Sequence, residues 1–195
     1  CMTPDAVLEK VDENTIFAIH SMTKTVTTVA AMILHEKGMF QLDDPLHKYL
    51  PEFKEVKCKG SEGIYDCENE IKVVDILTHR SGYIYYLDNG DNWLTGTHNS
   101  LYPSYINTSR FNNLDDFSKA VAKHPLEFEP GSMYAYGLNQ AILGRLIEVI
   151  SGQTFYNFLK ENIFDKLGMS ETKFHLTDDE RLRLQPLRVN ICLLY

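Results

Sequence analysis

Apolar side chains recur at helical spacing in one long segment near the start of the chain. The residues that share one face of it are Val26, Val29, Ala30, Ile33 and Leu34. This spacing predicts an amphipathic helix over residues 21–37, and Gly38 is a natural stop directly after it. A short extended run at residues 15–19 leads into the helix.

Weaker helical patterns follow along the chain. They predict helices at residues 73–78, 114–122, 138–150 and 154–164, with a short one at 178–184. Residues 81–113 form a long segment rich in Tyr, Asn, Gly and Ser, and loops of that length are uncommon unless they are functional or disordered. The predicted structure is therefore dominated by helices.

Length and charge narrow the classes of protein that this chain can be. Its 195 residues, 44% of them hydrophobic, suffice for one domain with a buried core. The formal net charge of −8 argues against a nucleic-acid partner. The composition is that of a soluble globular protein. No apolar run is long enough to span a bilayer and no signal peptide is evident. The cellular compartment is not determined by these features.

Ser21 and Lys24 stand three residues apart where the long helix is predicted to begin. Residues at this spacing are neighbours on a helix surface, so the Lys24 amine can reach the Ser21 hydroxyl. That is the arrangement of a serine nucleophile with a lysine base, and the N–H groups of a first helical turn favour the anion formed after attack. A helix cap or a solvated surface serine is the alternative for the tetrapeptide alone. His20 is interpreted as a packing or loop residue, because Lys24 already holds the base position.

Several ordered blocks around this pair resemble one known family. FAIHSMTK (17–24) is similar to the nucleophile segment of the serine β-lactamase-related hydrolases, and GMFQLDDPLHKYLP (38–51) to its continuation. LTHRSG (77–82), EPGS (129–132) and DKLGM (165–169) resemble later blocks. This family contains class C β-lactamases, penicillin-binding DD-peptidases and related carboxylesterases. The resemblance covers about residues 15–174 and implies an α+β, β-lactamase/transpeptidase-like fold, represented here mainly by its helical lobe.

The resemblance assigns the family's second motif to Tyr136. In the family a tyrosine two residues before an asparagine shares proton transfer with the lysine; Tyr136 is retained here and Leu138 replaces the asparagine. A tyrosine beside an ammonium group can relay a proton between nucleophile and leaving group. Leu138 cannot bond to a ligand amide, which favours esters over β-lactams. A packing role for Tyr136 is the alternative, and Tyr134 is a competing candidate for the same position.

The family's third motif, a strand reading Lys-Thr-Gly, His-Thr-Gly or a relative, is not found in the sequence. In the family that strand contributes the second oxyanion N–H, and losing one such donor costs on the order of 100-fold in rate. The stretch HRSG (79–82) is interpreted as a turn with buried polar anchoring and not as a substitute. We therefore expect a single partial, truncated domain over residues 1–195, with an unassigned tail at 184–195.

Aromatic residues of the long loop are candidates for an acyl pocket. They are Tyr83, Tyr85, Tyr86 and Trp93. The equivalent region borders the cleft in the family, so Tyr83 and Trp93, together with Leu138, are the predicted substrate-binding residues. Packing of the loop onto the body of the protein is an equal alternative.

Cysteine and histidine positions bear on redox state and metals. Cys58 and Cys67 bracket a short glycine-containing stretch and could close a disulfide in an oxidising compartment; unpaired thiols are the alternative. His79, His98 and His124 lack the partner spacing of a zinc site. We expect no metal and no cofactor.

Together these motifs predict a serine hydrolase that acts on a small-molecule ester or amide. Ser21 would attack the carbonyl, Lys24 and Tyr136 would take and return the proton, and water would release the acyl-enzyme. A catalytically inactive remnant that serves as a binding or interaction module is the alternative. Helices that would pack on a sheet in the family would expose apolar faces here, so self-association is also expected.

Overall fold

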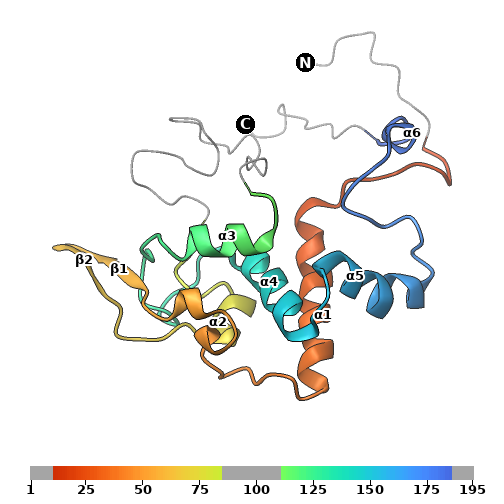
Figure 1. Cartoon of the computed structure of the whole chain (residues 1–195). Helices are drawn as coiled ribbons and strands as arrows, with labels where there is room; N and C mark the ends of the chain where they lie inside the picture. Colours follow the sequence, from red (N-terminus) through yellow and green to blue (C-terminus); the bar gives the residue numbers. More distant parts are fainter. Residues whose placement is uncertain (1–10, 85–110, 186–195) are drawn as a thin grey trace, which may run out of the picture.

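The computed structural model describes residues 11–84 and 111–185, in which six α-helices and one β-hairpin are joined by short 3-10 and π-helical turns and loops (Figure 1). The helices are α1 (Thr23–Glu36), α2 (Val73–Leu77), α3 (Leu114–Val121), α4 (Asn139–Ser151), α5 (Phe155–Leu159) and α6 (Asp178–Arg181). Strands β1 (Lys57–Gly60) and β2 (Gly63–Asp66) pair antiparallel, and these two strands make the one sheet of the described ranges. No helix within these ranges is both long and apolar enough to cross a bilayer.

The core is built around α4, which packs against α1, α2, α3 and α5 (Figure 1). The side chains that α1 buries are Thr27, Ala30, Ala31 and Leu34, and those of α4 include Ile142, Leu143, Leu146 and Ile147. Small alanines on α1 let the two helices approach closely. Val29 was expected on the buried face but is 46% exposed, whereas the next two residues, Ala30 and Ala31, are fully buried.

Helix boundaries differ from the predicted ones where local hydrogen bonding changes. The long helix is α-helical only from Thr23, after a 3-10 turn at His20–Met22. The segment predicted as one helix at 154–164 is α5 followed by a π-helical turn, Lys160–Phe164. Within that turn the Asn162 side chain donates to the Phe158 carbonyl at 3.0 Å, the acceptor that a regular α-helix would offer to the Asn162 backbone.

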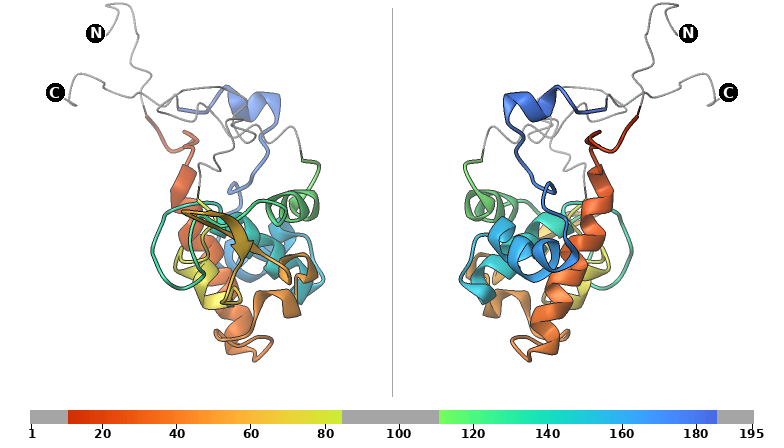
Figure 2. Two further views of the ribbon diagram at one scale, coloured as in Figure 1. Left: turned by 90° about the vertical axis from the view of Figure 1, so that its left-hand side faces the viewer. Right: turned by 90° about the vertical axis from the view of Figure 1, so that its right-hand side faces the viewer.

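The segment before α1 lies beside the chain that follows α6 at one end of the molecule (Figure 2). The Ile16 N–H donates to the Arg183 carbonyl at 2.9 Å, and the Gln185 N–H donates to the Ile16 carbonyl at 2.8 Å. The Arg183 guanidinium also bonds the Glu171 carboxylate at 2.6 Å. The described end of the chain is thereby joined to the segment that leads into Ser21.

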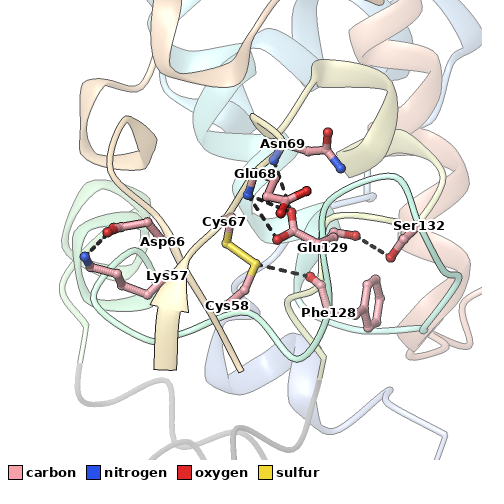
Figure 3. The surroundings of a disulfide bond; sticks show 9 residues. All are labelled: Lys57, Cys58, Asp66, Cys67, Glu68, Asn69, Phe128, Glu129 and Ser132. Atoms are coloured by element: carbon pink, nitrogen blue, oxygen red, sulfur yellow. Dashed lines mark hydrogen bonds and ion pairs between the residues drawn. A yellow bond between two sulfur atoms is a disulfide. The ribbon is translucent and has the colours of Figure 1, made fainter. Parts of the chain in front are cut away.

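A disulfide between Cys58 and Cys67 closes the β1–β2 hairpin, with the two Cα atoms 5.1 Å apart (Figure 3). The structure thus selects the paired state of these cysteines over the free thiols. The hairpin was not predicted from the sequence, because its strands are short and β2 is exposed along its whole length, so no alternation of polar and apolar residues marks it.

The hairpin is also attached to the segment that leads towards Tyr136. The Lys59 N–H donates to the Leu126 carbonyl at 2.8 Å, and the Leu126 N–H donates to the Lys57 carbonyl at 2.7 Å. Further along, the Glu129 carboxylate accepts the two backbone N–H groups that follow Cys67, at 3.0 and 3.1 Å (Figure 3). The disulfide therefore stabilises the hairpin to which residues 126–129 are bonded.

Replacing Cys58 and Cys67 together by serine is expected to lower the free energy of unfolding by about 2–3 kcal/mol. The bond joins residues nine apart in sequence, and its removal returns conformational entropy to the unfolded chain. Urea unfolding followed by circular dichroism measures the change, and the reduced wild-type protein is the matched control. The expectation would be contradicted if the double serine variant and the reduced wild type both had the same unfolding free energy as the oxidised wild type.

Candidate active site

Ser21 lies in the 3-10 turn that connects the extended N-terminal segment to α1. The preceding His20 has a φ of 42°, a left-handed conformation that is uncommon for a residue with a side chain. Such backbone strain is often found where a functional side chain must be presented. Both His20 and Ser21 are exposed, so His20, the first residue of the 3-10 turn, is not a core packing residue, and Ser21 lies at the surface.

The Lys24 amine donates a hydrogen bond to Ser21 Oγ at 3.1 Å. Ser21 lies in the 3-10 turn and Lys24 in the first turn of α1, and residues three apart on continuous helical backbone are neighbours on one face. Lys24 is partly buried while Ser21 is exposed. The pair therefore has the contact that a serine nucleophile and its base require.

The Tyr136 ring lies beside the same amine, although it comes from the segment before α4. The distance from Lys24 Nζ to the ring centroid is 4.8 Å, within the range at which a cation is attracted to an aromatic face. Tyr136 is 42% exposed, which does not fit the alternative of a core packing residue. Tyr134 is more exposed, at 66%, and its ring contacts His79 edge-on at 6.2 Å. The structure thus brings Ser21, Lys24 and Tyr136 together.

His79 lies under this group as a buried imidazole. Its ring centroid is 4.7 Å from that of Tyr136, and its Nδ1 accepts the Gly137 N–H at 3.3 Å. Burial lowers the pKa of His79, and the nearby positive charge of Lys24 lowers it further. The ring is therefore favoured in its neutral form, which can accept a hydrogen bond.

The turn at 79–82 is anchored by buried polar groups, as predicted. Ser81 Oγ donates to Asn139 Oδ1, and Asn139 Nδ2 lies 3.2 Å from His79 Nδ1 and 3.4 Å from the Tyr83 carbonyl. Asn139 is fully buried and is the first residue of α4. Neither His79 nor Asn139 was predicted from the sequence to be a neighbour of the site. The sequence signal that could have indicated Asn139 is its place directly after Leu138, the residue that stands where the family has an asparagine.

Two of the predicted substrate-binding residues are buried in this structure. Leu138 is 4% exposed, and Tyr83 is fully buried with its ring edge-on to Phe53 at 5.8 Å. Burial also raises the pKa of the Tyr83 phenol. Both side chains belong to the core cluster. The third, Trp93, lies outside the described residues, as do Tyr85 and Tyr86.

One group of potential metal ligands is found within the described ranges. It consists of Cys58, Cys67 and Glu129, whose ligand atoms lie within 4.8 Å of one another. Both sulfur atoms are bonded to each other, so neither is a thiolate that could bind a soft metal. The group does not fit a metal site in the oxidised protein.

A family model described as Beta-lactamase matches residues 5–188. The chain belongs to the Beta-lactamase family. Among curated proteins it is similar to esterase EstB from Burkholderia gladioli, with 31% identity over 169 residues that cover 87% of this chain and 41% of that protein. This membership confirms the resemblance found in the sequence.

Two solved structures of related proteins share the fold. One is EstCE1, described as a hydrolase with promiscuous acyltransferase activity, with a TM-score of 0.66 at 26% identity over 86% of this chain and 41% of that one. The other is simvastatin synthase (LovD) from Aspergillus terreus, with a TM-score of 0.65 at 25% identity over 90% and 46%. The predicted β-lactamase/transpeptidase-like fold is thus confirmed, and the chain spans about two fifths of the length of the curated relatives it matches.

Proposed function

We propose that this chain carries the nucleophile of a serine hydrolase that acts on a small ester or amide. The observation that carries the proposal is the 3.1 Å hydrogen bond from Lys24 Nζ to Ser21 Oγ, with the Tyr136 ring against the same amine. The esterase EstB among the relatives supports an ester substrate.

In the proposed reaction Ser21 Oγ attacks the carbonyl carbon while its proton passes to the Lys24 and Tyr136 pair. The tetrahedral intermediate then collapses: the bond to the leaving group breaks, the leaving group takes up the proton, and an acyl-Ser21 ester remains. Water attacks this ester in a second step and regenerates the hydroxyl. The Ser21 backbone N–H would supply one of the two oxyanion donors.

The competing function is that of an inactive binding module. Within the described ranges the paired strands are β1 and β2, and the hairpin that they form is bonded to the segment 126–129. Neither strand is therefore assigned as the source of a second oxyanion donor. Loss of such a donor slows acylation but leaves the serine activated by its base. A reagent that reports activation of the serine separates the two functions.

Fluorophosphonate labelling followed by intact-mass measurement is the test. We expect a single adduct on the wild-type chain and none on Ser21→Ala. Ser132→Ala is the matched control, since Ser132 is also exposed but does not belong to the Ser21, Lys24 and Tyr136 group. This substitution should leave labelling unchanged. Absence of an adduct on a wild-type chain that circular dichroism shows to be folded would contradict the hydrolase and support the binding module. Self-association stays a prediction alongside this proposal.

A further inference from the structure

We propose that His79 is a positioning residue that holds Tyr136 in place against Lys24. The inference rests on the proposed function, because it assigns a purpose to the placement of Tyr136. Within the described ranges His79 contacts Tyr136, the residues around it and Asn139, but not Ser21, so its effect would pass through Tyr136.

The backbone N–H groups of the two residues that flank Tyr136 both donate to His79. The Ala135 N–H donates to the His79 carbonyl oxygen at 3.0 Å, and the Gly137 N–H donates to His79 Nδ1 at 3.3 Å. One residue therefore fixes the chain directly before and directly after Tyr136. Because the backbone is held at both ends, the direction in which the Tyr136 side chain leaves it is restricted.

The Tyr136 ring is supported by the same residue. The His79 and Tyr136 rings are 4.7 Å apart at an interplanar angle of 34°, and Lys24 Nζ lies 4.8 Å from the Tyr136 centroid. Tyr136 is 42% exposed whereas His79 is 8% exposed, so the fixed member of the ring pair is His79. A ring contact at this distance favours one orientation of the Tyr136 side chain.

His79 is itself held in an unusual conformation. Its φ of 57° lies in the left-handed region, which is unfavourable for a residue with a side chain. Asn139 at the start of α4 lies 3.2 Å from the ring nitrogen that binds Gly137. Since a backbone N–H can only donate, Nδ1 must be the acceptor and the ring proton belongs on Nε2. Burial and the charge of Lys24 both disfavour the imidazolium, which would lose this acceptor.

Two substitutions that tolerate a positive φ separate these contributions. His79→Gly removes both the ring and the acceptor while relaxing the backbone. His79→Asn also tolerates the left-handed region and places its side-chain oxygen near the position of Nδ1, which restores the acceptor without the ring. We expect labelling of Ser21 to fall about 100-fold in His79→Gly and to recover about tenfold in His79→Asn, because small misplacements of a catalytic group cost rates of this order.

A second readout does not depend on labelling. With the protein labelled with 15N-glycine, the Gly137 amide is expected to exchange with solvent at least tenfold faster in His79→Gly than in the wild type, and more slowly again in His79→Asn. With 13C-labelled tyrosine, the Tyr136 ring signal is expected to shift in both variants. Urea unfolding of each variant identifies any loss of global stability, which would move all protected amides and not Gly137 alone.

The outcomes distinguish this inference from the proposed function. Unchanged labelling, Gly137 exchange and Tyr136 signal in both variants would overturn the role of His79 while Ser21 labelling of the wild type still stood. A fall in His79→Gly without recovery in His79→Asn would overturn the role of Nδ1 as acceptor. If the wild type itself is not labelled, the proposed function fails, and the exchange and ring signals still test whether His79 holds Tyr136.

Discussion

Lys24→Met is expected to slow fluorophosphonate labelling of Ser21 about 1,000-fold, in the middle of the range for loss of a general base. Methionine keeps most of the length of the side chain but has no amine to accept the Ser21 proton. The 3.1 Å bond to Oγ and the 4.8 Å contact with the Tyr136 ring both end at the Lys24 amine, so one substitution removes both. The rate is measured from the time course of the intact-mass adduct.

A second substitution at the same position separates a base from a fixed charge. Lys24→Arg keeps the positive charge, but a guanidinium stays protonated and cannot take up the proton. We therefore expect Lys24→Arg to be nearly as slow as Lys24→Met. Lys37→Met is the matched control, since Lys37 is exposed at the other end of α1. Labelling of Lys24→Met within tenfold of the wild-type rate would contradict the assignment of Lys24 as the base.

Gly137→Ala is expected to lower the free energy of unfolding by about 3 kcal/mol or more and to slow labelling as well. A Cβ at this position would lie 2.1 Å from the Tyr83 carbonyl oxygen and 2.6 Å from Ile84 Cα. Both are backbone atoms that cannot rotate away, and Gly137 forms an isolated bridge with Ile84. Overpacking of a buried site typically costs 1–3 kcal/mol, and a clash with backbone belongs at the upper end.

Gly144→Ala is the matched control for this substitution. Its nearest neighbour would be Leu114 Cδ1 at 3.2 Å, a side-chain atom that can move. Alanine is favoured over glycine inside a helix by about 1 kcal/mol, so Gly144→Ala should stay within about 1 kcal/mol of the wild type. Urea unfolding compares the two variants. Equal unfolding free energies for Gly137→Ala and the wild type would show that the bridge to Ile84 can open without cost.

The local parts of the site could be predicted from the sequence. Ser21 and Lys24 are three residues apart, and either a 3-10 turn or an α-helix brings that spacing onto one face, so the contact survived the change in helix type. Tyr136 was identified by resemblance to a family, and membership of that family is now shown for most of the chain. Its position beside Lys24, by contrast, depends on how the segment before α4 is attached to the rest of the fold.

Long-range partners could not be read from the pattern of residues. His79 and Asn139 are separated by 60 residues in the chain. Both are polar, and only folding buries them next to each other. Tyr83 was predicted to meet a substrate because the equivalent loop borders the cleft in the family, and Leu138 because it takes the place of the family's asparagine; both side chains are buried in the core. Hydrophobic periodicity indicates which face of an element is buried, but it does not say which element covers it.

By itself the sequence determined the helical segments, the Ser21–Lys24 pair and the family, because each depends on residues near one another in the chain or on ordered blocks of sequence. The tertiary structure alone decided that Cys58 pairs with Cys67, that the hairpin they close supports residues 126–129, and that His79 accepts the backbone N–H groups of both residues beside Tyr136. These contacts join segments that are distant in the chain. Their formation depends on how the elements pack around α4, and the conformational preferences of neighbouring residues do not determine that packing.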